Sequence, residues 1–113
     1  MAKEIPVVDM EDFPAELPKL REACEEWGCF RIINHNIPSA LRSEMKLVVR
    51  SLLDLPAEIK RRNTDRIPGS GYVPPTPKNP IYEALGLYDA ASVEDVADFC
   101  SQLEASPQQR LLL

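Results

Sequence analysis

The sequence lacks most of the residues on which metal and acid–base sites are built. It contains a single histidine, His35, among 113 residues. A facial site for non-haem iron takes two histidines and one carboxylate, so this chain cannot complete one. A histidine that closes a strand beside Asn34 is more often a hydrogen-bonded structural residue. No sequence spacing indicates a nucleophile next to His35, although the sequence does not exclude one that the fold brings close. We therefore expect no catalytic, cofactor-binding or metal-binding residue in this chain.

Cysteine is scarce, and long apolar runs are missing. The three cysteines, Cys24, Cys29 and Cys100, form no Cys-x-x-Cys pair. An odd count without such a pair favours reduced thiols, and Cys24 and Cys100 fall on apolar helix faces, which indicates packing rather than redox or metal chemistry. No signal-peptide core and no segment of membrane-spanning length is visible. We expect a cytoplasmic protein with no membrane partner.

Positive charge is also in deficit, since 13 Lys and Arg stand against 18 Asp and Glu, a net charge of −5. Nucleic acid is not an expected partner, because phosphate binding needs a concentrated excess of basic residues. The run Lys60-Arg61-Arg62 is short and is interpreted as a solvated helix end. The overall composition, with 44% hydrophobic and 27% charged residues, is typical of a globular protein. It predicts one domain over residues 1–113 with its own core.

The first third of the chain predicts a strand, a helix and a second strand. β-Branched residues indicate a strand over 5–9, and an apolar stripe at three- and four-residue steps indicates a helix over 15–27 that Gly28 ends. The stripe consists of Leu17, Leu20, Cys24 and Trp27. The segment 29–35 shows little polar alternation, which predicts a strand with both faces covered.

The rest of the chain predicts four helical segments around a proline-rich stretch. Helices are expected over 39–53, from Pro56 to Arg62, from Ser92 with Asp95 in a capping-box-like position, and from Ser106 with Pro107 as first helical residue. The inward stripe of 39–53 is Leu41, Met45, Val48, Val49 and Leu52, and that of the helix from Ser92 is Val93, Val96, Ala97, Cys100 and Leu103. The last helix has only six residues after Pro107, which leaves Leu111–Leu113 exposed.

Residues 63–80 hold five of the eleven prolines, so this stretch is either an ordered loop or a linker. Tyr72, Tyr82 and Tyr88 favour a packed loop, because flexible linkers seldom carry aromatic residues. Gly69-Ser-Gly71 has no strand-to-helix context for phosphate binding and is interpreted as a turn.

Several segments together resemble the N-terminal region of plant 2-oxoglutarate- and Fe(II)-dependent dioxygenases. They are Ile5-Pro-Val-Val-Asp9, Leu20-Arg-Glu-Ala-Cys-Glu-Glu-Trp-Gly-Cys-Phe-Arg-Ile-Ile-Asn-His35, Leu55-Pro-Ala-Glu-Ile-Lys60 and Gly71-Tyr72. Other segments resemble the subgroup that oxidises the auxin indole-3-acetic acid to its 2-oxo form. These are Arg62-Asn-Thr-Asp65, Asn79-Pro-Ile-Tyr-Glu83, Gly86-Leu-Tyr-Asp-Ala-Ala-Ser92, Phe99-Cys100 and Ala105-Ser-Pro-Gln-Gln-Arg110.

The resemblance implies an α+β fold: a helix-rich N-terminal region whose two strands extend the jelly-roll (double-stranded β-helix) sheet of a catalytic domain absent from this chain. The complete family member uses Fe(II) and 2-oxoglutarate, supported by ascorbate, but its His-x-Asp, second histidine and Arg-x-Ser motifs have no match here. Asn36 stands where the family usually has glycine, and asparagine tolerates the positive φ that the turn needs. The loop with Tyr72 and Tyr82 is the candidate for the substrate mouth.

Three hypotheses follow. The chain is the inactive N-terminal part of an auxin-oxidising dioxygenase, or of a relative that acts on another plant small molecule. Alternatively, it is a non-catalytic binding module that pairs through strand edges and its terminal leucines with the missing catalytic domain or a full-length homologue. An unrelated helical adaptor would require the match from Trp27 to His35 to be chance.

Overall fold

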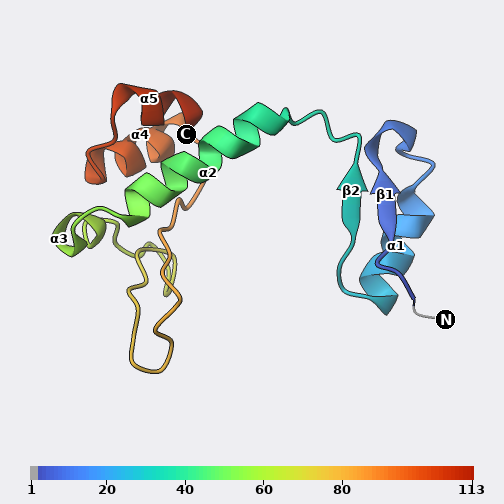
Figure 1. Ribbon diagram of the computed structural model, residues 1–113, viewed down its shortest axis with the longest axis horizontal. Coiled ribbons are helices and arrows are strands. Elements are labelled where there is room, and N and C mark those ends of the chain that lie inside the picture. Colours follow the sequence, from blue (N-terminus) through green and yellow to red (C-terminus); the bar gives the residue numbers. More distant parts are fainter. Residues whose placement is uncertain (1–2) are drawn as a thin grey trace. The chain divides into compact units, whose positions relative to one another are not determined.

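The computed structural model describes residues 3–113, which divide into two compact units with the boundary in the chain between Pro38 and Ser39. The first unit holds β1 (Val7–Asp9), the 3-10 turn η1 (Met10–Asp12), α1 (Leu17–Glu26) and β2 (Arg31–Ile33), and the second holds α2 (Ser39–Leu53), α3 (Ala57–Lys60), α4 (Val93–Gln102) and α5 (Pro107–Leu112) (Figure 1). The predicted α+β class is confirmed. No helix in the described residues is both long and apolar enough to cross a membrane.

The first unit is a strand–helix–strand arrangement. β1 and β2 pair in parallel with Val8 opposite Ile32, as expected when a helix connects two strands. Val8 is almost fully buried, at 1% exposure, and the Asn34 side chain donates a hydrogen bond to the Asp9 carboxylate (2.9 Å). Both strands are shorter than the predicted segments 5–9 and 29–35.

The prediction that β2 has both faces covered is wrong for this structure. Phe30, Ile32 and Ile33 are 41%, 42% and 45% exposed. The described part of the sheet has two strands, and the first unit contributes only α1 as a covering helix. The apolar sequence of β2 is therefore suited to a more extensive sheet than residues 3–38 supply.

The predicted inward stripe of α1 is also wrong in part. Ala23 is the buried residue of this helix, at 1% exposure, whereas Leu17, Cys24 and Trp27 are exposed. Within residues 3–38 no second helix lies along these side chains. The three-to-four periodicity thus identified the helix correctly but not the face that this unit buries.

The turns of the first unit agree with the sequence. Gly28 ends α1 with φ +70°, and Asn36 has φ +60°, as expected for the asparagine that replaces the family's glycine. Asn34 also has positive φ (+53°), a conformation that was not predicted from the sequence.

The second unit has its own hydrophobic core, formed where α2 and α4 bring together Val48, Leu52, Phe99 and Leu103. The bounds predicted for α2 are confirmed. Packed against the core are Leu55, Ile59, Leu85, Leu87, Leu112 and Leu113. Leu41, Val49 and Val93 were expected to face inward but are 40%, 43% and 80% exposed, and Ala97 of the same predicted stripe as Val93 is exposed as well. An apolar periodicity identifies one side of a helix along its whole length. In this unit only part of that side packs against another element, so the remaining apolar residues stay exposed.

α5 begins as predicted. Ser106 and Gln109 form a reciprocal capping box, with Pro107 in the first turn. Leu111 is 88% exposed, as expected, but Leu112 and Leu113 are half-buried against the core. The expectation that all three terminal leucines are exposed is therefore wrong, because one helical turn is enough to return two of them to the core.

Cys100 is buried (2% exposed), as its helix face predicted, and all three cysteines are free.

Leu103 and Leu47 offer a matched test of the core. Leu103 is fully buried, whereas Leu47 of α2 is 67% exposed. We expect Leu103→Ala to lower the free energy of unfolding by about 2–5 kcal/mol, because it removes buried methyl groups and leaves a cavity. Leu47→Ala should change it by less than about 0.5 kcal/mol. Urea denaturation followed by circular dichroism measures both, and equal effects would contradict this core.

Candidate functional site

The candidate site is the stretch between α3 and α4, residues 61–92, which carries both predicted mouth residues. Two isolated antiparallel bridges, Val73 with Ala84 and Thr76 with Asn79, fold its centre into a hairpin. It is held by side-chain contacts to the neighbouring helices, as expected for an ordered loop rather than a linker. The packed-loop prediction is right only in part, because residues 74–80 are exposed and Tyr82 and Tyr88 are 51% and 53% exposed. The side-chain contacts form three anchors.

The first anchor is a half-buried ion pair that also holds Tyr72. Lys60 Nζ donates to Glu83 Oε1 (2.8 Å) and to the carbonyl of Leu53 (2.7 Å), and it lies 5.3 Å from the centre of the Tyr72 ring. The Tyr72 hydroxyl donates to the other carboxylate oxygen of Glu83 (3.0 Å). Lys60 is 7% exposed, so the interpretation of this residue as part of a solvated helix end is wrong. The charge has a partner on each side, which allows it to be buried.

The pair shifts the pKa of both partners in the direction of the charged forms. Burial alone would lower the pKa of Lys60, but Glu83 and the neighbouring Tyr72 hydroxyl outweigh it and raise the pKa above its ordinary 10.5. The hydrogen bond from Lys60 lowers the pKa of Glu83 below its ordinary 4.5, although burial acts in the opposite direction. Both groups therefore stay ionised throughout the neutral range.

The second anchor is the side chain of Asn63, which is 5% exposed. Its amide nitrogen donates to the carbonyl of Gly86 (2.8 Å) and to Gln102 Oε1 (3.3 Å), while its amide oxygen accepts from the N–H of Gly86 (2.7 Å). The Asn63 carbonyl accepts from the N–H of Tyr72 (2.7 Å). One asparagine thus joins the start of the loop, its far side and α4.

Glycine is required at the two places where the loop passes closest to itself. A Cβ on Gly86 would collide with the carbonyl of Ser70, and a Cβ on Gly71 would lie 2.5 Å from the carbonyl of Asn63. Both obstacles are backbone atoms, which cannot move aside as a side chain can. The turn predicted at Gly69-Ser-Gly71 is confirmed, with Gly69 at φ +81°.

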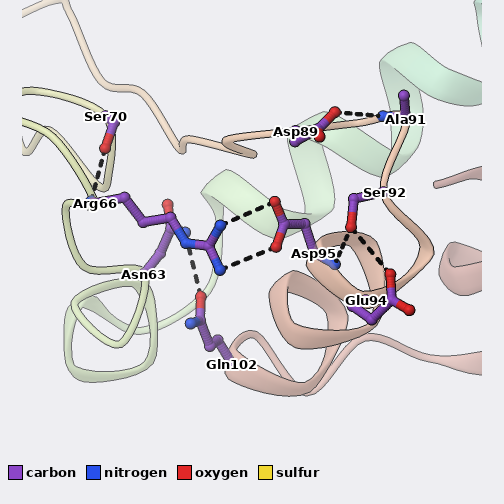
Figure 2. Close-up of polar contacts among 9 residues, drawn as sticks. All are labelled: Asn63, Arg66, Ser70, Asp89, Ala91, Ser92, Glu94, Asp95 and Gln102. Carbon is purple, nitrogen blue, oxygen red and sulfur yellow. Dashed lines mark hydrogen bonds and ion pairs between the residues drawn. The ribbon is translucent and has the colours of Figure 1, made fainter.

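The third anchor joins the loop to α4 through Arg66 (Figure 2). Its guanidinium binds both carboxylate oxygens of Asp95, each at 3.0 Å, and lies 5.3 Å from the centre of the Tyr88 ring. Ser92 caps α4 by accepting from the N–H of Asp95 (3.2 Å), as predicted, while the Asp95 carboxylate is engaged by Arg66. Beside this pair lies a polar cavity of about 110 Å³.

The two predicted mouth residues occupy different environments within this loop. Tyr72 is half-buried and has its hydroxyl engaged by Glu83, whereas Tyr82 is 51% exposed beyond the Val73–Ala84 bridge. Their role at a substrate mouth stays a prediction.

The residues present do not fit an iron site. Within residues 3–113, no three His, Cys, Asp or Glu side chains lie close enough to hold a metal ion. His35 Nδ1 accepts a hydrogen bond from the N–H of Ile37 (3.1 Å), which is a turn contact. The chemistry of an iron-dependent reaction cannot be derived from these side chains.

Comparison with known proteins identifies the family. Residues 5–110 match the family described as "non-haem dioxygenase in morphine synthesis N-terminal". The chain belongs to this family. This match and the relatives described below confirm the resemblance to plant 2-oxoglutarate-dependent dioxygenases.

Two plant proteins illustrate how much of its relatives this chain matches. The 2-oxoglutarate-dependent dioxygenase DAO of Oryza sativa subsp. japonica is 51% identical over 112 residues, which cover 95% of this chain and 37% of the relative. Oxoglutarate-dependent flavonoid 7-O-demethylase 1 of Ocimum basilicum is 39% identical over 77 residues, covering 60% of this chain and 21% of the relative. The chain spans well under half the length of these relatives.

Solved structures give the same result. Dioxygenase for auxin oxidation 1 of Arabidopsis thaliana, in its 2-oxoglutarate complex, superposes with a TM-score of 0.88 at 51% identity, over 96% of this chain and 42% of that one. Rice dioxygenase for auxin oxidation superposes with a TM-score of 0.75 at 49% identity, over 96% of this chain and 37% of that one. The fold described above matches the N-terminal part of these dioxygenases.

No pattern in the sequence predicted the three anchors. Asn63, Glu83 and Gly86 lie inside the segments that resemble auxin-oxidising dioxygenases, but nothing in their spacing indicated that they meet. A lysine within a basic run usually faces solvent, so Lys60 gave a misleading signal. Asn63 beside two arginines gave no signal for burial.

The Lys60–Glu83 pair predicts how stability depends on pH. Because the pKa of Glu83 is lowered, its contribution is complete above about pH 4.5 and is lost as pH falls through the lowered pKa. Because the pKa of Lys60 is raised, its contribution is complete below about pH 10.5 and is lost as pH rises through the raised pKa. At about pH 7 the native chain should therefore unfold at a higher urea concentration than Glu83→Gln. The difference between the two urea midpoints should shrink as the pH is lowered to about 2. Glu58→Gln, at an exposed position of α3, serves as control. A pH-independent difference for Glu83→Gln would contradict the pairing.

Asn63→Ala tests the second anchor. The substitution leaves the N–H and carbonyl of Gly86 without their partner, so we expect a loss of about 1–3 kcal/mol in unfolding free energy. Amide hydrogen exchange should rise at Tyr72 and Gly86. Asn79→Ala, at an exposed hairpin position, is the matched control and should change stability by less than about 0.5 kcal/mol. Equal exchange in both variants would show that Asn63 does not hold the loop.

Proposed function

We propose that this chain is the N-terminal portion of a 2-oxoglutarate-dependent dioxygenase that oxidises indole-3-acetic acid to its 2-oxo form. The observation that carries the proposal is the match, at 51% identity and a TM-score of 0.88 over 96% of this chain, to a dioxygenase for auxin oxidation. The flavonoid demethylase matches a smaller share of the chain at lower identity. An auxin substrate is therefore favoured over another plant small molecule.

In this proposal the chain itself carries no chemistry. Iron and 2-oxoglutarate are held by the part of the complete enzyme that the chain does not span, because the residues here do not fit an iron site. This chain contributes to substrate binding through the anchored loop, with Tyr72 and Tyr82 at the substrate mouth of the complete enzyme. Three anchors that join the loop to α3 or α4 support that role, since a binding loop must keep its shape.

The partner proposed for the first unit is the catalytic domain. Ile32 and Ile33 of β2 are exposed, and the sheet has no third strand within the described residues. Adding strands of a jelly-roll sheet would pair the free backbone groups and cover these side chains. A full-length homologue that supplies such strands is the alternative partner. We place the complete enzyme in the cytoplasm, in keeping with its free cysteines.

Two enzyme assays test this function. The purified chain, supplied with Fe(II), ascorbate, 2-oxoglutarate and indole-3-acetic acid, should release no succinate, and turnover above a metal-free control would contradict the proposed inactivity. Rice DAO in which this chain replaces the matching region should still release succinate with indole-3-acetic acid. A chimera that binds 2-oxoglutarate but oxidises a flavonoid instead would show that the substrate is wrong.

A further inference from the structure

The basic run Lys60-Arg61-Arg62, where α3 ends and the loop begins, contains two exposed arginines that the anchors do not use. Lys60 is buried, but Arg61 is exposed and forms no ion pair within residues 3–113. Arg62 makes a 3.4 Å contact with Glu104 in which both side chains are at least half exposed, which is a weak interaction. Both arginines are therefore available to a partner that carries acidic groups.

Thr64 follows these arginines by three and two residues. It is exposed, and its hydroxyl makes no hydrogen bond to another described residue. Protein kinases select substrates partly by charge pattern, and a kinase with acidic subsites would bind arginines at these two positions. We propose that Thr64 is a phosphorylation site for a kinase directed by basic residues, an inference that does not depend on the proposed function.

The phosphoryl group comes from ATP, which is the co-substrate of the kinase. The Thr64 Oγ1 attacks the γ-phosphorus, the bond from that phosphorus to the ADP oxygen breaks, and the hydroxyl proton passes to the catalytic carboxylate of the kinase. The products are phosphothreonine and ADP.

The modification would act on the third anchor. Thr64, Arg66 and Asp95 line the same polar cavity of about 110 Å³, together with Asp98. A phosphate carries close to two negative charges and competes for arginine, while it repels neighbouring carboxylates. Phosphorylated Thr64 therefore draws Arg66 away from Asp95 and detaches the loop from the start of α4.

The fold also controls access to this site. Asn63, next to Thr64, is buried and hydrogen-bonded to Gly86, so a kinase can extend the segment only when the second anchor opens. The folded chain should therefore be phosphorylated more slowly than a peptide of residues 58–68. Asn63→Ala should speed the reaction of the folded chain and leave the rate of the matching peptide unchanged.

The test incubates the full chain with ATP and a basic-directed kinase and maps the phosphate by mass spectrometry. We expect one phosphate on Thr64, none in Thr64→Val, and a loss of rate of at least about tenfold when Arg61→Gln and Arg62→Gln are combined. Arg42→Gln combined with Arg50→Gln, two exposed positions of α2, is the charge-matched control and should leave the rate unchanged. A phosphate on another residue, or none on either the chain or the peptide, would overturn the site.

A second measurement tests the effect on the anchor. Phosphorylated chain should show faster amide hydrogen exchange over residues 63–71 and at the start of α4 than the same chain incubated without ATP. Asp95→Asn without phosphate should reproduce that pattern, because it weakens the same ion pair. Unchanged exchange in a chain carrying phosphate on Thr64 would overturn the switch.

Discussion

The hydrogen bonds of Asn63 to Gly86 are the constraint on which the second unit depends. Residues 61–92 contain no helix or named strand, so their backbone groups need other partners. By pairing both the N–H and the carbonyl of Gly86, Asn63 fixes the residue between Leu85 and Leu87, and these two leucines then pack against the core. A polar contact in the loop thus decides where two apolar side chains of the core are placed.

The half-buried ion pair of Lys60 and Glu83 performs a related task at the other side of the loop. Two apolar residues in place of Lys60 and Glu83 would avoid the cost of removing charges from water. They would also leave the carbonyl of Leu53 without its donor and the Tyr72 hydroxyl without its acceptor. The pair therefore specifies one arrangement of α2, α3 and the hairpin, which a less directional apolar contact would not do.

The sequence predicts local structure well here and long-range polar contacts poorly. α2 and the caps at Ser92 and Ser106 follow from periodicity and capping chemistry, and Asn36 follows from its tolerance of positive φ. These features depend on residues within one turn of each other. Asn63 meets Gly86 across 23 positions, and Lys60 meets Glu83 across the same separation, so no local pattern records either contact. The same limit explains the misjudged faces of α1 and β2, since burial depends on what lies opposite.

The two units differ in how much of their apolar side-chain surface they bury. The second buries Phe99 and Leu103 among apolar residues from α2, α3, α5 and the loop. The first buries Val8 and Ala23, while ten of its large apolar residues are at least one-third exposed: Ile5, Val7, Met10, Phe13, Leu17, Trp27, Phe30, Ile32, Ile33 and Ile37. A two-stranded sheet with so little covered surface is marginal in water. Exposed apolar residues are thus denser in the first unit, with ten among residues 3–38 against nine among residues 39–113, whereas the second unit keeps its loop anchored by contacts within itself.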